Sequence, residues 1–285
     1  MNWVRSIAIL LVVKTAALAQ ETATPQIGEF ANVTRGHYQV LCEDGAGLGW
    51  EVNQFMNQML AQYSRYFSNW QAKDAARVVV FSNRDQFRAY SAGEVGLTHS
   101  GLAGYCHLKT DEDGNTFYEL VTYVHDDLWT VLAHEGFHQF IGYEMSTRAS
   151  GIPIWLNEGI AQFFETSYPV AGRLKTGVIS PRKLRAAQYL IQTREAPSVR
   201  TLLEMDRATF YANARVSYPM SWALVYYLMT RDGSNYSSSR FHRYLIDLKF
   251  NQNAVGSFQR RFGRDSNQWQ TDFERFILNL RIPKE

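Results

Sequence analysis

The sequence predicts an α+β protein in which a lobe built on a mixed β-sheet is followed by an all-helical C-terminal lobe. In the first half, short β-branched runs alternate with segments of helical spacing, whereas from residue 181 onward the spacing is only helical. No polar or proline-rich linker divides the 285 residues, of which 46% are hydrophobic. We expect a sheet lobe over residues 37–170 and a helical lobe over residues 171–285.

The N-terminus has the pattern of a secretory signal peptide over residues 1–19. Arg5 supplies the positive charge, residues 6–13 are apolar, and Ala17-Leu18-Ala19 offers a small-residue cleavage site. Lys14 interrupts the apolar run, which falls short of the roughly 20 residues that a membrane span needs. We therefore expect a secreted or periplasmic protein without a membrane span. Polar residues 20–36 are predicted to form a flexible lead-in.

The charge balance indicates which partners the protein does not bind, and the two cysteines bear on the compartment. Loss of Arg5 and Lys14 with the signal leaves 27 basic against 27 acidic residues, which argues against a nucleic acid or a membrane surface as partner. Cys42 and Cys106 both lie in predicted strands. In an oxidising compartment they form one disulfide or remain buried thiols, and the sequence leaves both alternatives open. The sequence does not determine the oligomeric state.

The sheet lobe is expected to combine short strands with two helices before the first motif. The predicted strands are residues 38–42, 77–81, 102–108 and 116–124, and the predicted helices are residues 48–70 and a short one starting at residues 82–85. The last two strands are joined by Asp-Glu-Asp-Gly-Asn at residues 111–115, a hairpin signal. Residues 116–124 are expected to form the edge strand of the sheet.

Two apolar helices carry the residues with recognisable chemistry. The first covers residues 128–142, follows the candidate caps Asp126 and Asp127, and contains His134-Glu135-Gly136-Phe137-His138. Histidines four apart lie on one helix face, close enough to share a cation. The second helix covers residues 154–166, with Pro153 expected in its first turn, and contains Trp155-Leu156-Asn157-Glu158-Gly159.

Together the two motifs predict a metal centre. His134, His138 and Glu158 supply two imidazoles and a carboxylate and leave one position open, which is typical of a catalytic zinc site with one ion per chain. Glu135 then lies where it can act as general base toward a water molecule at that position. The alternative is that two histidines lie on the surface of an ordinary helix.

The segments HEGFH and PIWLNEGIA resemble those of the gluzincin metallopeptidases, and chain length favours the bacterial peptidase MA-like family among them. The resemblance extends from about residue 37 to about residue 280, although only the two motif helices are specific. It implies a zinc metallopeptidase that acts on peptides or proteins, with an edge strand pairing with the substrate. It also implies a donor to the oxyanion from the helical lobe, for which Tyr218 is the first choice and Tyr211 the second. With sixteen tyrosines in the chain, a packing or surface role for Tyr218 is the equal alternative.

Some residues depart from the pattern of these families. Gln162 and Glu165 follow Glu158 by four and seven positions and are candidates to orient His134 or His138, while an exposed helix face is the equal alternative for Glu165. Some gluzincins have an acid at the first of these positions, where this chain has the neutral Gln162. The zinc aminopeptidases hold the substrate's amino group with a glutamate, but residues 101–105 contain no acid, and nothing in the spacing requires Glu119 to replace it. Endopeptidase activity is therefore favoured over aminopeptidase activity.

The helical lobe is predicted from spacing and end signals alone. Its expected helices are residues 182–195, 218–230, 238–250, 254–261 and 266–280, with Gly263 as a stop and Asp265 as a cap. Outside the motifs, His107 and His125 are expected to be solvated or hydrogen-bonded. A second functional class is a peptidase-like envelope protein that uses its cleft for binding or assembly with little or no hydrolysis.

Overall fold

The computed structural model describes residues 27, 29–67, 76–98, 101–111, 113–145, 152–170, 173–231, 239–250, 253–263 and 266–282. The predicted signal peptide and the predicted cap Asp265 lie outside these residues. Contacts divide the chain into a sheet unit, Met1–Ser64 with Asn69–Glu144, and a helical unit, Arg65–Ser68 with Met145–Glu285. The helix that carries Glu158 thus groups with the helical unit, whereas the predicted boundary at residue 170 had placed it with the sheet.

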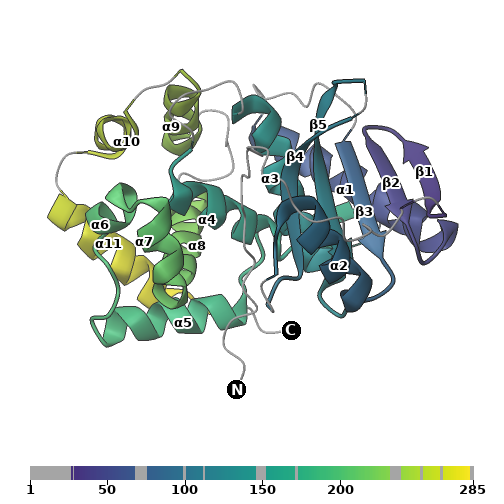
Figure 1. The fold of residues 1–285 in the computed structure, drawn as a ribbon. Helices are drawn as coiled ribbons and strands as arrows, with labels where there is room; N and C mark the ends of the chain where they lie inside the picture. Colours follow the sequence, from purple (N-terminus) through teal and green to yellow (C-terminus); the bar gives the residue numbers. More distant parts are fainter. Residues whose placement is uncertain are drawn as a thin grey trace. The chain divides into compact units, whose positions relative to one another are not determined.

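The sheet unit contains a five-stranded mixed sheet in the order β1-β2-β3-β5-β4 (Figure 1). Its strands are β1 (Ala31–Arg35), β2 (Tyr38–Cys42), β3 (Ala76–Phe81), β4 (Gly104–Thr110) and β5 (Thr116–Tyr123). The pairs β2–β3 and β3–β5 are parallel, and β1 and β4 are antiparallel strands at the two edges. The predicted α+β class, with a mixed sheet and a helical C-terminal portion, is confirmed.

The predicted edge strand is wrong, because β5 lies inside the sheet and β4 lies at its edge. After β3 the chain passes through α2 (Arg84–Val95) to the outer position of β4, and the following hairpin returns β5 to the gap beside β3. Asn83 begins α2, since its side chain accepts hydrogen bonds from the amides of Asp85 and Gln86. Sequence order alone does not reveal such a skipped position.

The predicted lead-in contains the other edge strand, so the expectation of a flexible segment through residue 36 is also wrong. Strand β1 pairs with β2 from Ala31↔Cys42 to Arg35↔Tyr38, which leaves Gly36 and His37 as a two-residue turn. Gly36 has φ of 63°, the left-handed region that such a turn requires.

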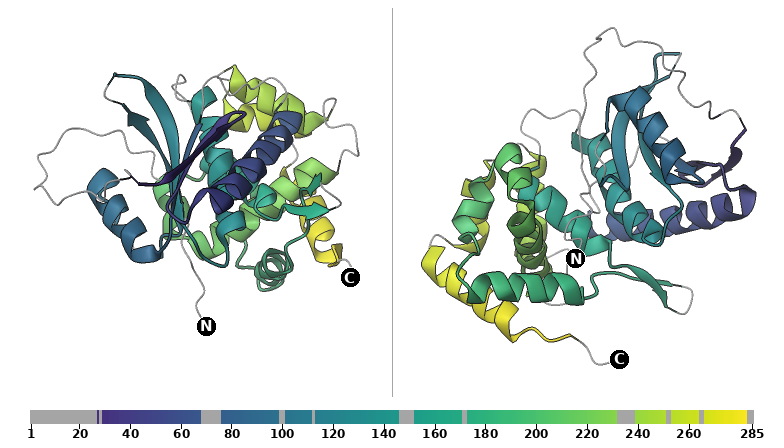
Figure 2. Two further views of the ribbon diagram at one scale, coloured as in Figure 1. Left: turned by 90° about the vertical axis from the view of Figure 1, so that its right-hand side faces the viewer. Right: turned by 60° about the horizontal axis from the view of Figure 1, so that its bottom comes forward.

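Helices cover both faces of this sheet (Figure 2). Helices α1 (Ala46–Tyr66) and α3 (Leu128–Met145) lie on one face, and α2 lies on the other. The core beneath α1 and α3 includes Val40, Val78, Val80, Leu120, Val52, Met56 and Leu132. The core beneath α2 includes Val79, Val121, Phe87 and Tyr90. Alternate residues of each strand therefore enter different cores.

Sheet order also decides between the two alternatives for the cysteines. Cys42 ends β2 and Cys106 lies in β4, so β3 and β5 separate them and three strand spacings amount to about 14 Å. A disulfide needs Cα atoms within about 7 Å. Both cysteines are free and buried, and burial raises the pKa of each thiol. The predicted disulfide pairing is wrong, and the alternative of buried thiols is confirmed.

The helical unit begins with α4 (Ile154–Phe164), which Pro153 precedes as N-cap rather than entering its first turn. A hairpin of β6 (Tyr168–Val170) and β7 (Arg173–Lys175) follows. The lobe that was expected to be all-helical therefore also contains a short strand, β7. The remaining helices are α5 (Pro181–Gln192), α6 (Val199–Glu204), α7 (Arg207–Ala212), α8 (Ala214–Thr230), α9 (Arg240–Lys249), α10 (Ala254–Phe262) and α11 (Ser266–Asn279). Gly263 ends α10 with φ of 104°, as predicted.

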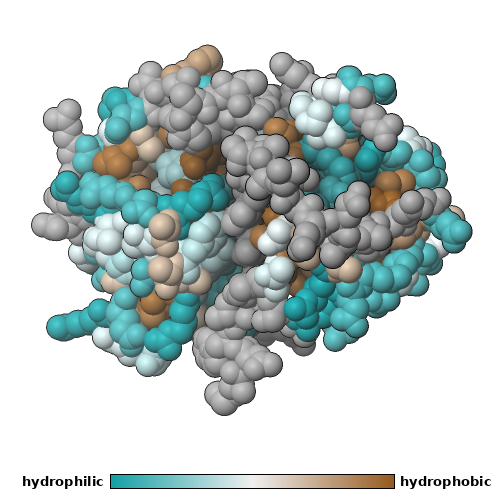
Figure 3. All heavy atoms as spheres, viewed as in Figure 1, coloured by the Kyte–Doolittle hydropathy of each residue, from teal (hydrophilic) through white to brown (hydrophobic). Residues whose placement is uncertain are grey.

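On the face drawn in Figure 3, hydrophobic residues form separate brown groups among hydrophilic ones. Within the described part of the chain, no helix combines the length and the apolar character that crossing a membrane requires.

Candidate metal centre

Close packing against α1 fixes the position of the helix that carries the two histidines. A Cβ atom on Gly136 would lie 2.7 Å from Met56 Cε and 3.0 Å from Tyr63 Oη. Tyr63 donates a hydrogen bond of 2.7 Å to the carbonyl of Ala133. Since successive residues are 100° apart around a helix, His134 and His138 lie on the side of α3 opposite Gly136. The glycine of HEGFH therefore lets α3 approach α1 while the histidines face away from it.

A second anchor ties α3 to the sheet. The side-chain amide of Gln139 is buried and donates hydrogen bonds of 2.8 Å to the carbonyls of both Arg77 and Tyr118. These carbonyls belong to β3 and β5, near the start of each strand. Rotation of α3 about its axis would break both bonds, so the direction of His134 and His138 is set by the sheet unit's own packing.

Helix α4 is fixed in a similar way within the helical unit. A Cβ atom on Gly159 would lie 2.7 Å from the carbonyl oxygen of Ser221 and 2.7 Å from Val225 Cγ2, so α4 and α8 are in close backbone contact. Gln162 Nε2 donates to the carbonyl of Tyr218 at 3.1 Å. The glycine that follows Glu158 thus serves the packing that positions this carboxylate.

The structure gives Gln162 and Glu165 partners other than the predicted histidines. Besides its bond to Tyr218, the Gln162 side chain donates to the carbonyl of Glu158 at 3.4 Å. Glu165 forms an ion pair with Lys183, whose ammonium group also donates to the carbonyl of Gln162 at 3.3 Å. Burial lowers the pKa of Lys183 although the Glu165 charge acts to raise it. Both residues therefore fasten α4 to its own unit, and their predicted role in orienting His134 or His138 stays a prediction.

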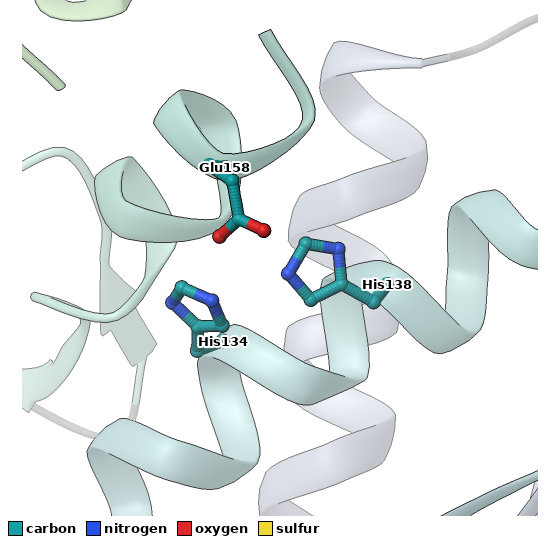
Figure 4. A group of neighbouring side chains, drawn as sticks. All are labelled: His134, His138 and Glu158. Carbon is teal, nitrogen blue, oxygen red and sulfur yellow. The ribbon is translucent and has the colours of Figure 1, made fainter. Parts of the chain in front are cut away.

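His134, His138 and Glu158 come together as predicted (Figure 4). Each offers one ligand atom, these atoms all lie within 4.8 Å of one another, and the three residues are buried. The imidazole centroids are 4.9 Å apart, and the carboxylate of Glu158 points toward both rings. Two imidazole nitrogens and a carboxylate oxygen are a donor set that zinc accepts. This group can hold a metal ion, and the alternative of two surface histidines is wrong.

Glu135 is fully buried on α3 beside His134. Burial is the main cause that raises the pKa of Tyr63 and of the Cys106 thiol, and the negative charge of Glu135 adds to the shift of both. The charge of Glu135 is therefore felt by two buried groups of the sheet unit. Glu135 is thus a buried carboxylate next in sequence to the candidate ligand His134, and its role as general base stays a prediction.

Tyr211, the second choice for the oxyanion donor, contacts a predicted ligand. Tyr211 on α7 donates a hydrogen bond of 2.9 Å from its hydroxyl to Glu158 Oε1. Tyr218 on α8 packs its ring against Phe210 and Tyr211, with centroid distances of 5.2 and 6.5 Å. The short helix α7 was not predicted, although Asp206 caps it through the amide of Thr209 at 2.8 Å. The oxyanion role of Tyr218 stays a prediction.

Glu119 is engaged on the far face of the sheet. It lies on β5 with its side chain on the same face as Val121 and Tyr123, which is the face that α2 covers. Its Oε1 atom accepts hydrogen bonds from Tyr90 Oη at 2.8 Å and His107 Nε2 at 3.2 Å. Glu119 is thus held by Tyr90 and His107, and His107 is hydrogen-bonded as expected.

One comparison with known proteins relates to this region. Residues 128–243 match the model of a family described as "Protein of unknown function (DUF1570)". No curated protein matches the chain. The matched segment begins at the first residue of α3 and includes both motifs and Tyr211. The similarity thus covers all residues of the candidate metal centre without assigning an activity to it.

Proposed function

We propose that this protein is a secreted or periplasmic zinc-dependent metallopeptidase. The observation that carries the proposal is the buried group of His134, His138 and Glu158, with Glu135 next to the first ligand. Three protein ligands of this kind leave a coordination position for water or substrate, unlike the four-ligand sites of structural zinc. The resemblance of HEGFH and WLNEG to gluzincins supports the same reading.

Each residue has a separate task in the proposed hydrolysis. A zinc ion held by His134, His138 and Glu158 would supply Lewis acidity at this site. Glu135 takes a proton from the attacking water and delivers it to the leaving amine nitrogen. Tyr218 is proposed to donate a hydrogen bond to the carbonyl oxygen as negative charge develops there. The protein thereby cleaves an amide bond without a covalent enzyme intermediate.

The proposed substrates are internal peptide bonds of peptides or proteins. No acid occurs at residues 101–105 to hold a free amino group, and Glu119 is bound by Tyr90 and His107 beneath α2. Neither residues 101–105 nor Glu119 therefore supports the binding of a substrate's free amino group, as an aminopeptidase would require. This favours endopeptidase over aminopeptidase activity.

The test is a comparison of the chain from Gln20 onward with its Glu135→Gln variant. Both proteins are loaded with zinc, their metal content is measured, and each is incubated with a pool of peptides and unfolded proteins. Mass spectrometry is expected to find new internal termini only with the wild type. A zinc-loaded wild type that retains uncleaved peptide would instead support the envelope binding function.

A further inference from the structure

Tyr211 reaches a carboxylate that is itself fully buried. Its hydroxyl donates to Glu158 Oε1 at 2.9 Å, and Glu158 has an exposed fraction of 0%. A hydrogen bond to an ionised carboxylate is about twice as strong as one between neutral groups. An ordinary packing role explains the ring contact of Tyr211 with Tyr218, but it does not explain a hydroxyl placed on this oxygen.

Helix α7 holds Tyr211 in place from both ends. At its start, Asp206 accepts hydrogen bonds from the amide of Thr209 at 2.8 Å and from the hydroxyl of Thr209 at 3.1 Å. Phe210, next to Tyr211, is fully buried against the ring of Tyr218. The position of the Tyr211 hydroxyl is therefore set by the packing of the helical unit.

Arg207 adds to the donor strength of this hydroxyl. Its guanidinium donates a hydrogen bond of 3.3 Å to Tyr211 Oη and lies 5.9 Å from the ring centroid. Electron density drawn toward a cation polarises the O–H bond, so hydrogen bonds in such a chain strengthen one another. The order of donation is from Arg207 to Tyr211 to Glu158.

We propose that Tyr211 is a positioning residue that occupies one oxygen of Glu158 and thereby directs the other oxygen to the metal. Ligand carboxylates are commonly held by such partners, and loss of one typically weakens metal affinity by 10–100-fold. This inference rests on the proposed function, because it presupposes that Glu158 is a metal ligand. It gives Tyr211 a task different from that of Tyr218, whose predicted partner is the substrate.

The experiment measures the zinc dissociation constant by competition with a chelator. Tyr211→Phe removes the hydroxyl and keeps the ring, and we expect it to weaken zinc binding by about 10–100-fold. Tyr218→Phe is the matched control, since its ring packs against the same helix, and its zinc affinity should equal that of the wild type. Equal melting temperatures of the metal-free proteins establish that the fold is unchanged.

A double-mutant cycle tests whether Tyr211 acts through Glu158. In a Glu158→Ala background, the additional change Tyr211→Phe should leave the residual zinc affinity unchanged, because the partner of the hydroxyl is already missing. An additional loss in that background would show that Tyr211 acts elsewhere, which contradicts the proposal.

The possible outcomes separate this inference from the proposed function. If the wild type binds zinc and Tyr211→Phe binds it equally well, the positioning role is wrong and the proposed function stands. An equal loss in Tyr211→Phe and Tyr218→Phe would indicate general loosening of α7 and α8, which also overturns it. A folded wild type that does not bind zinc overturns the proposed function and this inference together.

Discussion

Tyr211 and Tyr218 have adjacent rings but different predicted tasks, so their variants should differ in kinetics. Tyr218→Phe removes the proposed donor to the oxyanion, and loss of one such donor typically costs 10²–10³-fold in kcat. We expect kcat to fall by roughly that factor with zinc content unchanged. Steady-state assays on a peptide found in the cleavage screen measure this. A Tyr218→Phe enzyme with wild-type kcat would contradict the role.

Glu119 is predicted to support stability rather than catalysis. Besides Tyr90 and His107, the cations of Arg77 and Lys109 lie 3.6 and 3.5 Å from its carboxylate. Glu119→Gln leaves these groups without their anion. Breaking a buried ion pair costs about 3–5 kcal/mol, and Arg77 and Lys109 are partly exposed, so we expect the lower end of that range. The free energy of unfolding should therefore fall by roughly 3 kcal/mol. Urea unfolding at neutral pH measures the loss, and zinc affinity should not change.

Glu119 should also make the stability of the folded protein depend on pH, and the direction of that dependence follows from its pKa. Burial acts to raise the pKa of Glu119, but the His107 hydrogen bond and the Lys109 charge outweigh it, so the pKa lies below its ordinary value of 4.5. The stabilisation is therefore complete above the unfolded pKa and is lost as pH falls through the lower folded pKa. In acid, the stability of the wild type should decline toward that of Glu119→Gln. A constant difference between the two down to pH 3 would contradict this.

At the residue scale, the sequence predicts those features of the site that local geometry determines. That His134 and His138 lie on one face follows from helix periodicity. Glu158 was predicted because Trp155-Leu156-Asn157-Glu158-Gly159 resembles a motif of the gluzincins. The partners of Gln162 and Tyr211 depend on how α4, α7 and α8 pack, which no local pattern encodes. Their roles therefore required the structure.

At the scale of elements, the contact of α4 with α8 makes Gly159 sensitive to a single methyl group. Alanine normally stabilises a helix interior by about 1 kcal/mol relative to glycine, but here its Cβ would meet the Ser221 carbonyl at 2.7 Å. We expect Gly159→Ala to destabilise the protein by about 1–3 kcal/mol, the usual cost of overpacking. Gly47→Ala in α1, where nothing lies within 4 Å, is the control and should be neutral or stabilising. Thermal unfolding compares them.

The predicted elements differ from the observed ones where they are short. Most long helices and inner strands were predicted to within a few residues, because their apolar spacing is sustained. Helices α6 and α7 have six residues each, too few for periodicity to show, and only the caps Ser198 and Asp206 mark them. Strand β1 is as long as the predicted β2, but none of its residues is buried, so its sequence lacks the strong apolar pattern of an inner strand. It was missed although Arg35-Gly36-His37 contains a turn glycine.

At the scale of the whole molecule, strand order could not be predicted from the chain. A disulfide between Cys42 and Cys106 was plausible as long as the neighbours of β2 and β4 were unknown. The skipped position that places β5 between β3 and β4 excludes that pairing and makes β4 the edge strand. Long-range pairing of this kind depends on helix packing over both faces of the sheet, not on any one segment.

Zinc binding should stabilise the whole protein by linkage. Because the ligands come from α3 and α4, an ion that binds only the folded chain adds about 2.7 kcal/mol when its free concentration is 100 times Kd. We expect zinc to raise the melting temperature of the wild type and a chelator to reverse the rise. His138→Ala should show no such response. A zinc-dependent rise of equal size in His138→Ala would mean that the metal binds elsewhere.

The measurement that most directly tests the central claim is cleavage of unfolded protein by the zinc-loaded chain beside Glu135→Gln. The proposal predicts that both proteins carry one zinc ion per chain, and that only the wild type produces new internal termini. Loss of the general base should reduce the rate by about 10²–10⁴-fold. Equal cleavage by Glu135→Gln, or a zinc-loaded wild type that cleaves nothing, would contradict it.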